Sequence, residues 1–163
     1  MPYSNMDCVM AAPDAGMVIA VAAFTADAER LFELLTDTVE IGRWWGGRRG
    51  GSSVTWIGTP ETGAAWRAEG TFSRNRSFTA SGVFLQVEPA HRIVQSWLAS
   101  WDNLFHTEAS LRFERIEDGT VLSVVHKGFE GREAACQAQA QFWWKVIKWL
   151  RAHLLDERSA AGL

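Results

Sequence analysis

Hydrophobic and polar positions alternate most regularly within residues 104–116, where every second residue from Phe105 to Phe113 is apolar or Thr. This pattern predicts a strand, because successive side chains of a strand point to opposite faces. One face of the sheet is then covered and the other is in contact with water. Asp118 and Gly119 follow as a hairpin turn signal, so residues 120–129 are expected to form the returning strand.

Other short apolar or alternating segments predict a larger sheet. A buried strand is expected at residues 17–24, before any helix. Further strands are predicted at 52–58, 64–72, 78–89 and 91–100.

Helical periodicity appears in three places. Residues 25–37 carry an apolar stripe at helical spacing, with Thr25 as the expected N-cap, and a second short helix is expected to follow to about Trp45. A long helix is predicted at about 132–157. Because the helices do not alternate with the strands, the predicted class is α+β with an antiparallel sheet of about six or seven strands.

The C-terminal helix has one broad apolar face when its residues are placed at 100° intervals. Trp144 falls on the opposite face, beside Lys148 and Arg151, and Trp149 lies at the edge. The apolar face comprises Ala135, Cys136, Gln139, Phe142, Trp143, Val146, Ile147, Leu150 and Leu154.

This face is thin at its start, near Cys136 and Gln139, and bulky from Phe142 onward. The difference in volume predicts space between the helix and the sheet at the thin end. A solid core would use the same residue types, so the pattern leaves open whether this space is a cavity or is filled.

Composition and charge narrow the function classes. The chain has 163 residues, 47% of them hydrophobic, and a formal net charge of -3, which predicts a soluble protein that binds neither nucleic acid nor membrane. The two cysteines, Cys8 and Cys136, have no metal-ligand spacing and favour a cytoplasmic location. Residues 1–15 are expected to be a flexible leader, 16–157 a single domain and 158–163 a tail.

Four segments together resemble the activator of heat-shock-90 ATPase homology family, within the START-like, birch-pollen-allergen-like superfamily. They are residues 26–46, 82–97, 113–129 and 142–154, and their order and spacing carry the likeness. The resemblance implies a helix-grip fold, in which a curved antiparallel sheet wraps the long terminal helix and a cavity often lies between them. Members include small-molecule carriers, polyketide cyclases and co-chaperones.

Candidate chemistry is sparse. No paired histidines, inward carboxylate dyad or nucleophile motif is visible, so we expect no catalytic residue, no metal and no cofactor. Gln139 is the most informative polar residue, because a buried amide needs partners from the backbone, from water or from a ligand. The residues expected to line a ligand site are Trp45, Trp66, Phe72, Trp97, Phe105, His126, Gln139 and Trp143.

The favoured function is therefore the binding of an apolar or aromatic small molecule in an aromatic-lined cavity. A cyclase or hydrolase acting in the same cavity is one alternative. A co-chaperone-like protein that binds a partner through Trp144, Lys145, Lys148 and Arg151 is the other. Homodimer formation is left open.

Overall fold

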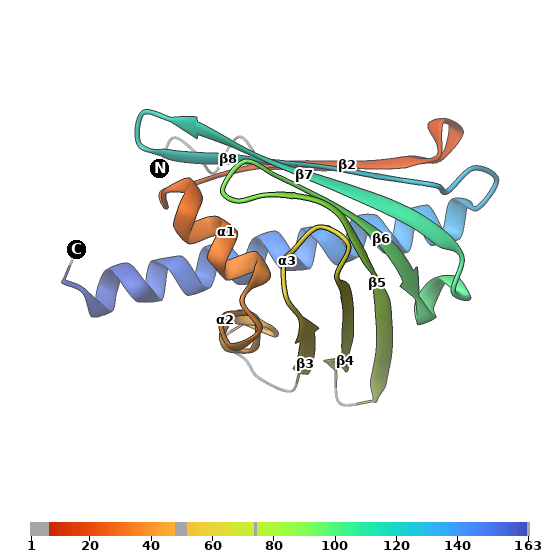
Figure 1. The fold of residues 1–163 in the computed structure, drawn as a ribbon, viewed down its shortest axis with the longest axis horizontal. Coiled ribbons are helices and arrows are strands. Elements are labelled where there is room, and N and C mark those ends of the chain that lie inside the picture. The colour runs from red at the N-terminus through yellow and green to blue at the C-terminus, as the bar shows by residue number, and fades with distance from the viewer. Residues whose placement is uncertain (1–6, 48–51, 74, 163) are drawn as a thin grey trace.

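One antiparallel sheet of eight strands curves around the C-terminal helix in the computed structural model (Figure 1). The structure describes residues 7–47, 52–73 and 75–162. The strands follow each other across the sheet in the order β1-β2-β8-β7-β6-β5-β4-β3. Their bounds are β1 Cys8–Ala12, β2 Met17–Phe24, β3 Ser53–Gly58, β4 Ala65–Ser73, β5 Arg76–Glu88, β6 Arg92–Ala99, β7 His106–Ile116 and β8 Gly119–Lys127.

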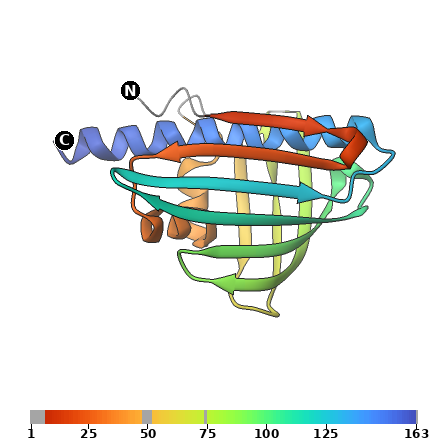
Figure 2. The same ribbon diagram turned by 90° about the horizontal axis from the view of Figure 1, so that it is seen from above.

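The long helix α3 (Glu133–Ala160) lies along the concave side of this sheet, as the view from above shows (Figure 2). Two short helices, α1 (Ala28–Thr36) and α2 (Thr38–Trp44), follow β2 and flank the C-terminal half of α3. Two single turns, η2 (Pro13–Ala15) and η3 (Ser100–Asp102), complete the elements. The predicted α+β helix-grip architecture is confirmed.

The starts of α1 and α2 are each fixed by an aspartate. Asp27 accepts a hydrogen bond from the Arg30 amide at 2.8 Å and is the N-cap of α1, in place of the expected Thr25. Asp37 ends α1 and begins α2, where its carboxylate accepts from the amides of Val39 and Glu40. One residue therefore sets the bend between the two helices.

The β7–β8 hairpin forms as the sequence predicts. Glu117 and Asp118 form the turn, and Gly119 is the first residue of β8, where it pairs with Ile116. A Cβ atom on Gly119 would lie 1.9 Å from the carbonyl oxygen of Phe24, so only glycine permits this close approach of the backbone to β2.

The expected chain ends were wrong in two places. Cys8–Ala12, assigned to the flexible leader, is an edge strand paired with β2, and this raises the strand number to eight. Its signal is weak because the strand is short and two of its five residues are alanine, and only pairing with β2 lets Val9 and Ala11 pack on the core. Residues 1–6 of the expected leader lie outside the described residues.

The C-terminal boundary also moves. Helix α3 continues to Ala160, three residues into the expected tail. Arg158 explains part of this extension, because its guanidinium donates a hydrogen bond to the Thr25 hydroxyl at 3.2 Å.

A single arginine connects the three helices. Arg30 of α1 forms ion pairs with Glu33 of its own helix, with Glu40 of α2 at 3.1 Å and with Glu157 of α3. These carboxylates, Glu157 foremost, raise the pKa of the guanidinium above its ordinary value.

The substitution Arg30→Met is expected to lower the free energy of unfolding by about 1–2 kcal/mol, because charge-assisted hydrogen bonds are lost while the apolar stem is kept. Chemical denaturation at low and high salt checks this, and the loss should shrink at high salt. Arg43→Met is the matched control, since Arg43 is exposed and pairs with Glu40 of its own helix. An equal loss in both variants would contradict a connecting role for Arg30.

Candidate functional site

The inner face of α3 is the one that the helical periodicity predicts. Every residue of the predicted face is buried except Ala135, which is half-buried. Trp144 is 40% exposed, as its place on the opposite face requires. The helix therefore packs on the sheet through Phe142, Trp143 and the aliphatic residues that follow.

Aromatic rings fill most of the space between α3 and the sheet. The Phe142 ring lies 5.5 Å from both Trp97 and Trp101, and 6.1 Å from Trp45, measured between ring centroids. Trp45 in turn stacks on Phe78 at 5.4 Å. Contacts at these separations are each favourable beyond the area that they bury.

A small void remains beside the bulky half of α3. Its volume is about 30 Å³, and Trp44, Trp56, Gln95, Trp97 and Phe142 are among the residues that line it. A water needs about 10–15 Å³ of such space, whereas pockets for small ligands reach roughly 300–1,000 Å³. The void therefore has room for one or two waters in this conformation.

The void lies beside the middle of α3, at Phe142, Trp143 and Val146, and not at the thin end that side-chain volumes predict. At the thin end, Gln139 and Cys136 are completely buried. Trp101 donates a hydrogen bond to the Gln139 side-chain oxygen at 3.2 Å, and the Cys136 sulfur lies 3.4 Å from the Met17 carbonyl oxygen. The volume argument considered the helix alone and left out Trp101, which η3 carries over this end.

His126 is fully buried and links the sheet to the helix. Its Nδ1 accepts a hydrogen bond from the Trp143 indole at 3.1 Å, so Nε2 carries the proton and donates to the Thr107 hydroxyl at 2.8 Å. Burial lowers the pKa of His126 to about 3. With both ring nitrogens engaged and the ring neutral, His126 is a structural connector and is poorly placed to accept a proton from a substrate.

Two of the buried donors that have no acceptor among the described residues belong to this region. They are the indole nitrogen of Trp97 and the side-chain nitrogen of Gln139. Trp97 also lines the void. A buried donor without a partner costs free energy, so an acceptor atom entering near Trp97 would be stabilised.

The structure brings seven of the eight expected site residues into one cluster. Trp97 contacts Trp66 at 4.8 Å and His126 at 5.4 Å. Gln139 joins the cluster through Trp101. The seven residues are Trp45, Trp66, Phe72, Trp97, His126, Gln139 and Trp143.

Phe105 does not join them. It is 53% exposed, and the Arg132 guanidinium lies 4.5 Å from its ring centroid. The alternation in the sequence includes Phe105, but β7 begins one residue later, at His106. The two residues before Phe105, Asn103 and Leu104, have positive φ and form a turn. This turn takes Phe105 out of the strand and away from the inner face.

Sequence reasoning missed several residues of the void. Trp56 follows Val54 at the two-residue spacing of one strand face, and this signal was available. Gln95 carried the same signal, because it lies two residues before Trp97 on β6. Trp44 had no such signal, because its position depends on how α2 meets α3.

One group of possible metal ligands lies near the C-terminal end of α3. Ligand atoms of Glu40, His153 and Glu157 lie within 4.8 Å of one another. The Arg30 guanidinium forms ion pairs with both of these glutamates, and its positive charge opposes a cation there. We interpret the group as part of the ion-pair network between the helices.

Comparison with known proteins gives the family. Residues 25–154 match the family model described as Activator of Hsp90 ATPase homolog 1-like protein. The chain belongs to this family. The match spans both short helices, strands β3 to β8 and most of α3, so the helix-grip architecture and the aromatic cluster lie within the family domain.

Solved structures share the fold. A protein from Mycobacterium smegmatis is similar at a TM-score of 0.74 and 14% identity, covering 96% of this chain and 98% of that one. A Rhodobacter sphaeroides protein gives a TM-score of 0.73 and 22% identity, with 95% and 99% covered. CalU16 from Micromonospora echinospora gives a TM-score of 0.65 and 21% identity, with 94% of this chain and 88% of that one covered.

At these identities the structural likeness shows the fold alone. A comparison with curated proteins gave no match. Among the described residues, no helix is both long and apolar enough to cross a membrane.

Proposed function

We propose that this family member binds an apolar, aromatic small molecule between the sheet and α3, in the cytoplasm. The observation that carries the proposal is the buried indole N–H of Trp97, which has no acceptor in the described part of the chain and lies beside a void walled by aromatic rings. A flat aromatic ligand with one acceptor atom would stack on these rings and accept from Trp97. Two unpaired cysteines favour a reducing compartment.

The ligand enters this site only if side chains move, because the void holds no more than a water or two. Trp44 and Trp45 are anchored by indole hydrogen bonds to the carbonyl oxygens of Leu34 and Thr71. Trp56 is half-buried on the edge strand β3, where its ring stacks on Trp66 at 5.1 Å. We propose that Trp56 rotates outward to admit the ligand.

Quinoline and naphthalene test this proposal as a matched pair, because they have nearly the same shape and only quinoline carries an acceptor nitrogen. Quinoline is expected to bind about five- to tenfold more tightly than naphthalene, because one hydrogen bond contributes a net free energy of that size. Tryptophan fluorescence or calorimetric titration at neutral pH measures both affinities.

The variant Trp97→Phe keeps an aromatic ring and removes the donor. It should bind the two probes with equal affinity, while Trp144→Phe, on the outer face, should keep the preference for quinoline. If neither probe binds the parent protein, and native mass spectrometry of protein from cells shows no bound small molecule, the proposed function is wrong.

A further inference from the structure

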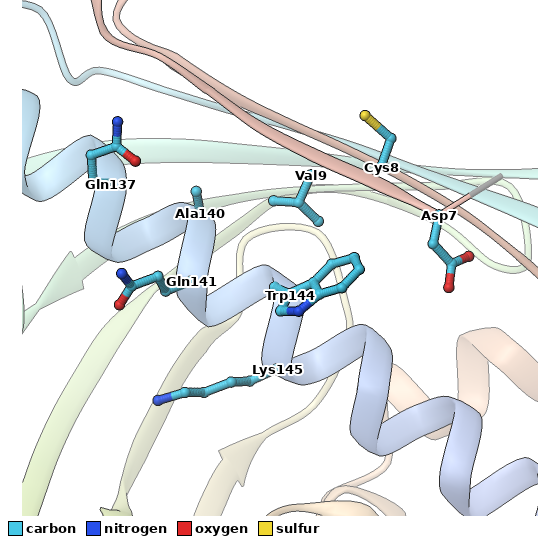
Figure 3. A pocket seen from close by; sticks show the side chains of 8 residues that line it. All are labelled: Asp7, Cys8, Val9, Gln137, Ala140, Gln141, Trp144 and Lys145. Carbon is cyan, nitrogen blue, oxygen red and sulfur yellow. The ribbon is translucent and has the colours of Figure 1, made fainter. Parts of the chain in front are cut away.

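An open groove lies on the outside of the molecule, between β1 and the outer face of α3 (Figure 3). Its volume is about 560 Å³. Val9 of β1 and Ala140 of α3 point into it, and Trp144 stands between the strand and the helix (Figure 3). Gln141 and Lys145 lie at its rim on the helix. The groove is separate from the interior aromatic cluster.

The strand beside the groove is an unprotected sheet edge. β1 pairs with β2 on one side, and in the described part of the chain no strand pairs with its other side. Edge strands usually carry charged residues, proline or a bulge, which prevent pairing with other chains. Cys8–Ala12 contains no charged residue or proline, and its pairing with β2 runs without a register shift. This edge is therefore open to a further strand.

The helix beside the groove is basic, although the chain as a whole has a net charge of -3. From Ala134 to Leu155 the helix carries no Asp or Glu. Lys145 and Lys148 are exposed on its outer face. Asp7, the one acid of the groove lining, is paired with Arg151 and its side chain is only 4% exposed. The surface charge therefore favours an acidic partner.

Trp144 gives the groove an apolar anchor. It is 40% exposed, and the Lys148 ammonium lies 4.2 Å from its ring centroid. Exposed tryptophans that a partner covers are frequent sources of binding energy.

We propose that an extended, acidic peptide segment of a partner protein binds in this groove as a ninth strand along β1. Its backbone would pair with the free edge of β1, and alternate side chains would rest on Trp144. Its carboxylates would face Lys148, whose ammonium lies beside Trp144. A second copy of this chain fits less well, because a two-fold contact through β1 would bring the same basic helix face from both copies together.

A capped peptide of three Val-Thr-Glu-Thr repeats, which places Val and Glu on the same face of a strand, provides the probe, and the same peptide with Lys in place of Glu is its control. The acidic peptide is expected to shift the amide resonances of Cys8–Ala12 and the indole resonance of Trp144, and to slow amide exchange in β1. The basic peptide should do neither. Binding of the acidic peptide should weaken as salt is added.

Two variants separate the parts of the groove. Trp144→Ala should weaken binding at least tenfold, in the range of a tryptophan anchor. Lys148→Glu should weaken it and reduce its salt dependence, while Arg112→Glu, an exposed charge change on β7, should leave it unchanged. Trp144 is exposed, so its variant is expected to fold, and the far-ultraviolet circular dichroism of each variant checks this.

Three outcomes would overturn the proposal. One is equal binding of the acidic and basic peptides. Another is that no amide resonance of β1 shifts at acidic peptide concentrations up to roughly 2 mM, at which even weak binding would be detected. The third is a parent protein that sediments as a dimer with β1 amides already protected, which would assign the edge to a second copy.

Discussion

Replacing Trp143 with Ala is expected to lower the free energy of unfolding by about 3–5 kcal/mol, the usual cost of removing a buried Trp. Trp143 is 3% exposed. Its ring contacts Phe142 at 5.2 Å and Trp97 at 6.0 Å, and its indole donates to His126. The substitution would therefore leave a cavity and also an unsatisfied acceptor on the histidine.

The neighbouring residue is the matched control. Trp144→Ala removes the same side chain from the exposed face and is expected to cost less than about 1 kcal/mol. Urea denaturation of both variants measures the difference. Similar losses would mean that α3 packs on the sheet in a different rotation from the one described.

Acid is expected to destabilise the fold through His126, by about 2–3 kcal/mol between pH 6.5 and pH 4.5. The pKa of the buried imidazole is lowered to about 3, against an ordinary value of 6.5. In this window the unfolded chain binds a proton that the folded chain excludes, so stability falls as pH falls. One pH unit corresponds to about 1.4 kcal/mol when one proton is taken up on unfolding.

The measurement is the urea midpoint as a function of pH, for the parent and for His126→Gln. The variant should be less stable at pH 7, because it loses the bonds to Thr107 and Trp143, yet its stability should fall less between pH 6.5 and 4.5. His106→Gln serves as the control, since His106 is exposed and lies outside this hydrogen-bonded group. It should keep the parent's pH dependence. A variant at position 126 that keeps the full acid sensitivity would assign that sensitivity to other groups.

Regular periodicity predicted the fold well where one element alone determines which side is buried. The rotation of α3 follows from its own residues, and so do the alternating faces of β7 from Thr107 to Phe113. β1 escaped detection because its five residues gain their order from pairing with β2.

The candidate site was predicted less fully, because its volume depends on side chains from several elements. The small residues Cys136 and Gln139 indicated space, but Trp101 reaches them from η3. Phe105 continued an apparent alternation, but a turn with positive φ precedes it. The positions of Trp101 and Phe105 depend on the path of the backbone between elements. Hydrophobic patterns carry little information about that path.

The position of β2 in the sheet has a consequence for synthesis of the chain on the ribosome. β2 lies between β1 and β8, and it pairs Met17 with Lys127 and Phe24 with Thr120. These partners are about a hundred residues apart, a separation that makes pairing slow. During translation one side of β2 therefore stays without its partner until β8 leaves the exit tunnel, and α3 follows later still. We expect the nascent chain to keep apolar surface exposed for most of its synthesis and to depend on the cell's chaperones during that time.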